Sequence, residues 1–159
     1  MPDQFDPTGR KYLEIHIERI LPASHEQVWE AWTNREQLVR WWNVATLSTN
    51  LHKFDPRPRG QWTMVSRTKG GKEVVEYLTF DDLLVPERLE FRRLGRPCAR
   101  YRAVLQVHDH SGTHIDYWMS FRSQDYQATP SVGRVQVEQI IERAERMRIE
   151  RLAALFLPK

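Results

Sequence analysis

The chain has 159 residues, of which 40% are hydrophobic and 28% charged, and its formal net charge is +3. This composition excludes a disordered or low-complexity protein, and the length fits one folded domain. The small net charge gives no argument for nucleic-acid binding. No apolar run reaches the roughly 18 residues of a membrane-spanning helix, so we expect no membrane span. The single cysteine, Cys98, excludes an intramolecular disulfide.

The first residues, MPDQFDPTG, lack the basic and apolar regions of a signal peptide, so we expect a cytoplasmic protein. Residues 1–9 contain two prolines and a glycine, and we predict that they form a flexible tail. We expect a single domain over residues 10–159.

The first predicted strand and helix follow this tail. Leu13, Ile15 and Ile17 alternate with polar residues, which predicts a half-buried strand. Ser24 and Gln27 have the spacing of a capping box, so we expect a helix to begin directly after Ser24.

A second short helix, which Asn34 can cap, carries Leu38, Trp41 and Trp42 on one face because these residues lie three and four positions apart. Residues 28–42 hold four of the chain's six tryptophans. These rings either close one end of a core or line a cavity. We expect two or three of the four to belong to the core, and Trp41 or Trp42 to line a pocket.

The rest of the chain reads as a meander of antiparallel strands over residues 46–123, followed by one long helix. A Gly-Gly tip at residues 70–71 and the sequence DHSG at residues 109–112 indicate hairpin turns. After a loop over residues 123–133, a helix is predicted over about 135–157, and it must bury one side against the sheet. Its predicted apolar stripe consists of Val137, Ile140, Ile141, Ala144, Met147, Leu152 and Leu155.

Four sequence segments resemble one known family. They are RILPASHEQVWEAWTNREQLVRWW (residues 19–42), FDPRPRGQW (54–62), VPERLEF (85–91) and GTHIDYWMSF (112–121). In this order they resemble the START/Bet v 1-like (SRPBCC) superfamily, in the branch named after the C-terminal domain of the activator of Hsp90 ATPase. Two features differ: Arg59 replaces the first glycine of that branch's Gly-Gly turn, and the last helix has no tryptophan.

The resemblance implies an α+β helix-grip fold. In this fold a curved antiparallel sheet of about seven strands wraps around a long C-terminal helix, and two short helices follow the first strand. Members of the superfamily bind ligands between helix and sheet, serve as co-chaperone domains, or act as cyclases. The resemblance therefore implies a fold and leaves the function open.

Alternation along the strands predicts which side chains face the helix, and for residues 74–84 we favour Leu78 and Phe80 inward. Tyr101, Tyr117 and Arg93 are the polar candidates among these side chains. A buried guanidinium requires an acidic partner, an anionic ligand or a position at a cavity mouth. Packing in the core is the alternative role for every residue of the set. The candidate ligand-binding residues are Trp41, Trp62, Met64, Phe80, Phe91, Arg93, Tyr101, Tyr117, Met119 and Met147.

The sequence gives less support for a metal site or for catalysis. His108, Asp109, His110 and His114 surround a turn and could bind a metal ion. A turn of this composition is also typical of a solvated hairpin, so we predict no metal and no cofactor. The motifs of serine hydrolases, zinc proteases and phosphate-binding loops are missing. We predict no catalytic residue, and the sequence favours a protein that is not an enzyme without deciding the point.

We expect an internal cavity that binds a small apolar or amphipathic molecule, in a carrier or a sensor. The first alternative is an interaction module of the co-chaperone kind, in which Trp118, on the other side of its strand, meets a protein partner or a second copy of the chain. The second alternative is a cyclase- or hydrolase-like enzyme that uses the same cavity.

Overall fold

The computed structural model describes residues 12–43, 48–95, 97–122, 125 and 134–158. The predicted tail and most of the predicted loop over 123–133 lie outside these residues. Within the described part of the chain, no helix combines the length and the apolar character needed to cross a membrane.

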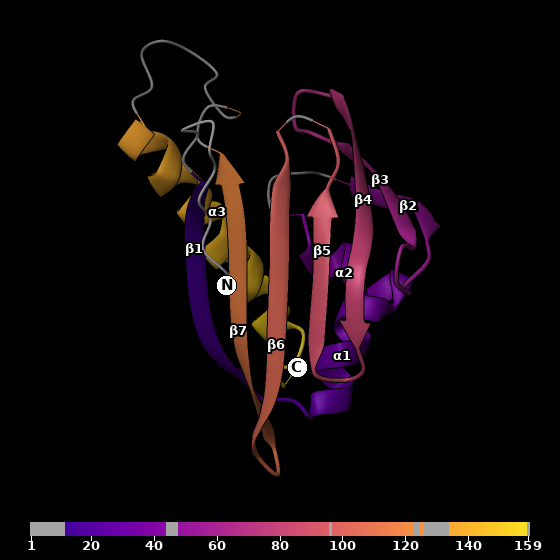
Figure 1. Ribbon diagram of the computed structural model, residues 1–159. Coiled ribbons are helices and arrows are strands. Elements are labelled where there is room, and N and C mark those ends of the chain that lie inside the picture. Colours follow the sequence, from indigo (N-terminus) through magenta and orange to yellow (C-terminus); the bar gives the residue numbers. More distant parts are fainter. Residues whose placement is uncertain (1–11, 44–47, 96, 123–124, 126–133, 159) are drawn as a thin grey trace.

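Seven strands form one antiparallel sheet in the order β1-β7-β6-β5-β4-β3-β2. From β2 to β7 each strand pairs with the next strand in the chain, as expected for a meander, and β1 pairs with β7 (Figure 1). The strands are β1 (Tyr12–Leu21), β2 (Ser48–Phe54), β3 (Gln61–Arg67), β4 (Glu73–Leu84), β5 (Arg88–Arg93), β6 (Ala99–Asp109) and β7 (Gly112–Arg122).

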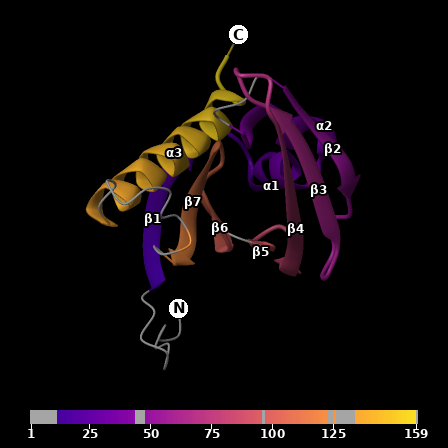
Figure 2. The ribbon, with the colours of Figure 1, turned by 90° about the horizontal axis from the view of Figure 1, so that it is seen from above.

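Three helices lie on the concave side of this sheet. They are α1 (His25–Thr33), α2 (Arg35–Trp41) and α3 (Arg134–Ala154). Figure 2 shows α3 running over the β1 and β7 side of the curve, and α1 and α2 inside the other half. The long helix, the curved sheet and the two short helices after β1 confirm the predicted helix-grip fold.

The caps of the two short helices confirm their predicted starts. The Ser24 side chain accepts a hydrogen bond from the Gln27 backbone, and the Gln27 side chain accepts one from the Ser24 backbone. Asn34 caps α2 by accepting a hydrogen bond from the Gln37 N–H at 3.0 Å. These bonds satisfy N–H groups that a helix start leaves without an intrahelical partner.

The turn between β2 and β3 holds Arg59 in a left-handed conformation, with φ at 65°. The backbone N–H of Arg59 donates to the Phe80 carbonyl at 2.8 Å, and Phe80 donates back to Gly60 at 2.9 Å. A Cβ atom at Gly60 would collide with the carbonyl oxygen of Asp55. The turn therefore requires glycine at position 60, and it keeps at Arg59 a conformation that glycine adopts at lower cost.

The inward face of the sheet matches the predicted alternation. Leu78 and Phe80 are buried, as favoured for the strand whose phase was ambiguous. The other buried side chains on this face include Trp62, Met64, Leu89, Phe91, Tyr101, Ala103, Leu105, Ile115, Tyr117, Met119 and Phe121.

The predicted apolar stripe of α3 is wrong at two positions. Ile140 and Met147 are 62% and 50% exposed, whereas Ile149 is fully buried. At 3.6 residues per turn, Met147 lies about 160° around the helix from Ile149, and Ile140 lies on the opposite side. The face that meets the sheet instead includes two charged residues, Glu145 and Arg148.

Candidate functional site

Aromatic rings fill the concave side of the sheet where α2 ends. The ring of Trp42 lies 5.4 Å from each of the rings of Trp62, Phe91 and Tyr101. Phe91 and Tyr101 stack with centroids 4.8 Å apart and planes 10° apart. These neighbours come from β3, β5 and β6, so Trp42 joins the short helices to three strands of the sheet.

Of the four clustered tryptophans, Trp32, Trp41 and Trp42 are fully buried and Trp29 is partly buried, which confirms that most of them belong to the core. That Trp41 or Trp42 lines a pocket stays a prediction. Trp41 donates its indole N–H to the Ala31 carbonyl at 2.9 Å, which ties α2 to α1. Trp42 rather than Trp41 lies against Tyr101 of the predicted ligand-binding set.

A buried ion pair from α3 enters this aromatic region. One nitrogen of the Arg148 guanidinium, Nη1, lies 3.0 Å from each Glu145 carboxylate oxygen. Its Nε donates to the Trp42 carbonyl at 2.8 Å, and its planar group lies 3.8 Å from the Trp42 ring centre. Burial by itself lowers the pKa of Arg148, but the Glu145 carboxylate, Tyr117 and Tyr101 together more than offset this, so the pKa is raised and the arginine stays charged.

Tyr117 of β7 completes the network. Its hydroxyl donates to Glu145 Oε2 at 2.6 Å. Burial raises the pKa of Tyr117 well above its usual value of 10.0, and the neighbouring Glu145 charge raises it further. Tyr117 therefore remains a hydrogen-bond donor, and Glu145 accepts from both a tyrosine and an arginine.

The Tyr101 hydroxyl lies in the same region but has no hydrogen-bond partner within the described part of the chain. Tyr101 is only 2% exposed, so bulk water does not reach its hydroxyl. Burial is the main cause that raises the pKa of this hydroxyl, which keeps it protonated. An unpaired buried hydroxyl costs about 1–3 kcal/mol. We call Tyr101, Tyr117, Glu145 and Arg148 the inner polar cluster.

Arg93 has an acidic partner, one of the three situations that its burial required. Its Nε lies 3.0 Å from Glu76 Oε2, and the two side chains are 17% and 18% exposed. Both residues lie near one end of the inward face, on β5 and β4. Arg93 also contributes to a surface pocket of about 270 Å³ over the ends of β5, β6 and β7.

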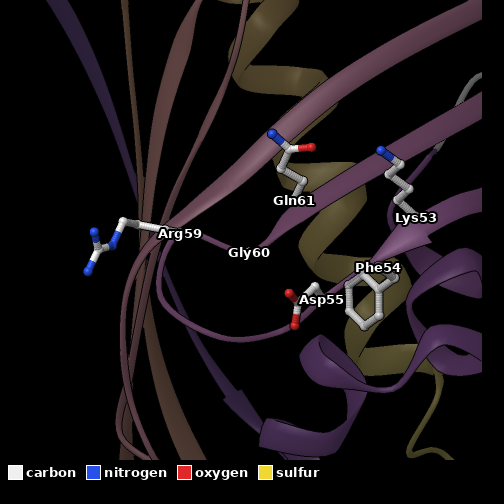
Figure 3. Close-up of a pocket in the computed structure, with 6 residues that line it drawn as sticks. All are labelled: Lys53, Phe54, Asp55, Arg59, Gly60 and Gln61. Atoms are coloured by element: carbon white, nitrogen blue, oxygen red, sulfur yellow. The ribbon is translucent and has the colours of Figure 1, made fainter.

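A second surface pocket, of about 430 Å³, lies at the turn between β2 and β3 (Figure 3). Lys53, Phe54, Asp55 and Gln61 line it, and the Arg59 side chain points away from the others. The ring of Phe54 also lies 6.1 Å from each of the rings of Trp62 and Phe80. This pocket therefore has a polar rim and one wall that belongs to the aromatic core.

The structure brings most of the predicted set onto one buried surface. Trp41 lies instead at the junction of the two short helices, Arg93 at the edge, and Met147 on the solvent side of α3. The residues brought together are Trp62, Met64, Phe80, Phe91, Tyr101, Tyr117 and Met119.

Sequence reasoning missed Glu145 and Arg148, although a signal was present. With Ile141 and Leu152 they follow one another at intervals of four, three and four residues, which is the spacing of a buried helix face. Two charges in such a row indicate a polar group inside a protein rather than a solvated surface.

The histidine-rich turn forms the hairpin between β6 and β7. The Asp109 carboxylate accepts hydrogen bonds from the Ser111 backbone at 2.8 Å and from its hydroxyl at 3.1 Å. The Ser111 backbone bond is the main cause that lowers the pKa of Asp109. His108 and His110 are exposed beside it.

Comparisons with solved structures support the fold. A protein from Chromobacterium violaceum is 18% identical with a TM-score of 0.72, over 92% of this chain and 99% of that one. A protein from Arthrobacter aurescens is 18% identical with a TM-score of 0.74, over 91% and 86%. The protein Ara h 8.0201 is 10% identical with a TM-score of 0.67, over 92% and 98%. A search of curated proteins found no match.

The sequence also matches a protein family over most of the chain. The family described as "Activator of Hsp90 ATPase homolog 1-like protein" matches residues 22–127, which include α1, α2 and the strands β2 to β7. Both the fold and the family therefore agree with the resemblance noted in the sequence. The chain belongs to the activator of Hsp90 ATPase homolog 1-like family.

Proposed function

We propose that this chain binds a small apolar or amphipathic molecule against the inner face of its sheet, and acts as a carrier or a sensor. The family and the fold support, in general, a ligand-binding role or a role like that of the Hsp90 ATPase activator. The observation that carries the proposal is the inner polar cluster, which places an ion pair and an unpaired hydroxyl among aromatic rings.

The energetics of this cluster favour a binding role over a purely structural one. A buried ion pair is often no more stabilising than apolar side chains of the same volume, so Glu145 and Arg148 add little that a core requires. The Tyr101 hydroxyl adds a cost instead of a stabilisation. A ligand whose polar end bonds to Tyr101 or to Arg148 would remove that cost, and its apolar part would lie against rings such as Phe91.

The test compares ligand occupancy in wild type and in Tyr101→Phe, by native mass spectrometry of gently purified protein. The substitution keeps the ring that stacks on Phe91 and removes only an unpaired hydroxyl. We expect the wild-type protein to carry an additional mass that Tyr101→Phe loses, while the variant unfolds at the same or a higher temperature. The matched control is Tyr77→Phe, because Tyr77 is 56% exposed.

Two outcomes would contradict this proposal. One is a bound molecule that Tyr101→Phe and Phe91→Ala retain as well as wild type does. The other is wild-type protein that carries no additional mass and shows no thermal shift with a panel of medium- and long-chain fatty acids. The second outcome would favour a role in protein interaction.

That second candidate function has its own observation. On the outer face, Trp118 stacks on His16 with centroids 4.6 Å apart and planes 6° apart, and the Arg102 guanidinium lies 5.1 Å from the Trp118 ring centre. Partly exposed aromatic and arginine side chains of this kind are enriched at protein interfaces. If the chain acts through a protein partner, Trp118→Ala should abolish that association, and Tyr101→Phe should leave it unchanged.

A further inference from the structure

The outer face of the sheet brings three potential metal ligands together where β1 lies beside β7 (Figure 1). His16 and Glu18 come from β1, and Asp116 comes from β7 directly opposite Glu18. One ligand atom from each residue lies within 4.8 Å of the other two. The shortest contact is 2.9 Å, between His16 Nε2 and Asp116 Oδ1.

We propose that His16, Glu18 and Asp116 form a binding site for a divalent transition-metal ion, with Zn²⁺ as the best match. One imidazole and two carboxylates are a donor set that zinc and its neighbours in the first transition row accept. Around a tetrahedral zinc ion, with bonds of about 2.1 Å, ligand atoms lie about 3.4 Å apart. Three protein ligands leave the fourth position to water or to an exchangeable group.

Neighbouring side chains orient these ligands. His114 Nδ1 lies 3.5 Å from the second carboxylate oxygen of Asp116, so Asp116 has one oxygen toward each histidine. Trp118 stacks on the His16 ring and restricts its plane. Partners that hold ligand side chains in place are a regular feature of metal sites and contribute to their affinity.

The charges in this group favour a cation over a simple ion pair. His16 contacts Asp116 at 2.9 Å. Within the described residues, however, Glu18 has no hydrogen bond or ion pair. Arg102, which lies over Trp118, pairs with Glu90 at 3.6 Å. The carboxylates of Glu18 and Asp116 carry negative charge that a divalent ion balances.

This site differs from the one that the sequence suggested. The histidine-rich turn places His108 and His110 near Asp109 through proximity in the chain. The proposed site instead joins His16 to Asp116, one hundred positions away. Because it lies on the outer face, its success or failure is independent of the proposed ligand binding on the inner face.

The experiment is a zinc titration of the full chain by isothermal titration calorimetry, after removal of metal with EDTA. The test variants are His16→Ala, Glu18→Gln and Asp116→Asn. The control variants are His52→Ala, an exposed histidine on β2, and His108→Ala at the hairpin turn. Circular dichroism and thermal unfolding establish that each variant folds, and Glu18→Gln keeps the shape of an exposed side chain.

We expect wild type and both controls to bind one zinc ion per chain, and each test variant to bind it at least about tenfold more weakly. With Co²⁺ in place of zinc, we expect a visible absorption band that His16→Ala loses. The proposal is overturned if wild type binds no zinc, or if the three test variants bind it as wild type does. Loss of binding in His108→Ala would also overturn it, because the ion would then lie at the hairpin turn.

Discussion

The two faces of the sheet use the same chemistry in different surroundings. On the inner face Arg148 lies 3.8 Å from the Trp42 ring centre and pairs with Glu145 at 3.0 Å. On the outer face Arg102 lies 5.1 Å from the Trp118 ring centre. It pairs with Glu90 at 3.6 Å. The side chain of Arg148 is 8% exposed and that of Arg102 is 31% exposed.

This difference in exposure decides how much each arginine–glutamate pair contributes to the stability of the fold. If the outer carboxylate is removed, water solvates the arginine at little cost. If the inner carboxylate is removed, the guanidinium stays inside an aromatic core with no water to replace its partner. The same pair of residue types is therefore a minor surface contact on one face and a sensitive buried element on the other.

The largest expected effect comes from Glu145→Gln, which removes the inner charge and nearly keeps the shape. We expect it to lower the free energy of unfolding by about 3–5 kcal/mol, because Arg148 becomes an unpaired buried charge. Urea unfolding followed by circular dichroism measures the change. The control is Glu142→Gln, whose exposed ion pair with Arg146 contributes no more than about 0.5 kcal/mol. Equal losses in the two variants would remove the distinction between a buried and an exposed ion pair.

The second effect is a loss of stability at alkaline pH. The pKa of Tyr117 is raised in the folded chain, while an unfolded tyrosine titrates near its usual 10.0. Above about pH 10 the unfolded chain releases this proton and the folded chain keeps it. The free energy of unfolding therefore falls by up to about 1.4 kcal/mol per pH unit for each such group. Below pH 10 both states hold the proton, and this contribution does not change.

Urea unfolding between pH 9 and pH 11 tests this dependence. Tyr117→Phe should reduce the slope, and Tyr77→Phe should not, because Tyr77 is exposed. An unchanged slope in Tyr117→Phe would mean that the buried hydroxyl ionises as readily as a tyrosine in water.

The smallest effect is expected on the outer face. Arg102→Ala should lower the free energy of unfolding by about 0.5–1 kcal/mol, through its contacts with Trp118 and Glu90. Added sodium chloride should reduce this loss, since salt screens exposed charges. Unfolding at low and high salt measures both quantities. A loss as large as that of Glu145→Gln, or one that salt leaves unchanged, would contradict the comparison.

Much of the fold could be predicted because its signals are local. Ser24 with Gln27 and Asn34 with Gln37 are neighbours in the chain, so their caps are visible in the sequence. The phase of the strand around Leu78 was ambiguous in the sequence, but the favoured inward position of Leu78 is confirmed. The tryptophan-rich helices were predicted as core, and Trp32 is fully buried.

The candidate site could be predicted only in part. Tyr101 and Tyr117 followed from alternation, and Arg93 was expected to need an acidic partner. The identity of that partner, Glu76, depends on the β4–β5 pairing and is not a sequence signal. For α3 the pattern of apolar residues alone predicted the wrong buried face, because Met147 is exposed while Arg148 is buried.

The sequence by itself determined the order of the elements, the caps of the short helices and the inward rows of the strands. These features depend on residues a few positions apart, through hydrogen bonds and periodicity that act locally. Only the tertiary structure decided which face of α3 meets the sheet, and so which charges are buried. It also decided that His16 meets Asp116 across one hundred residues, because strand pairing brings together side chains that no local pattern connects.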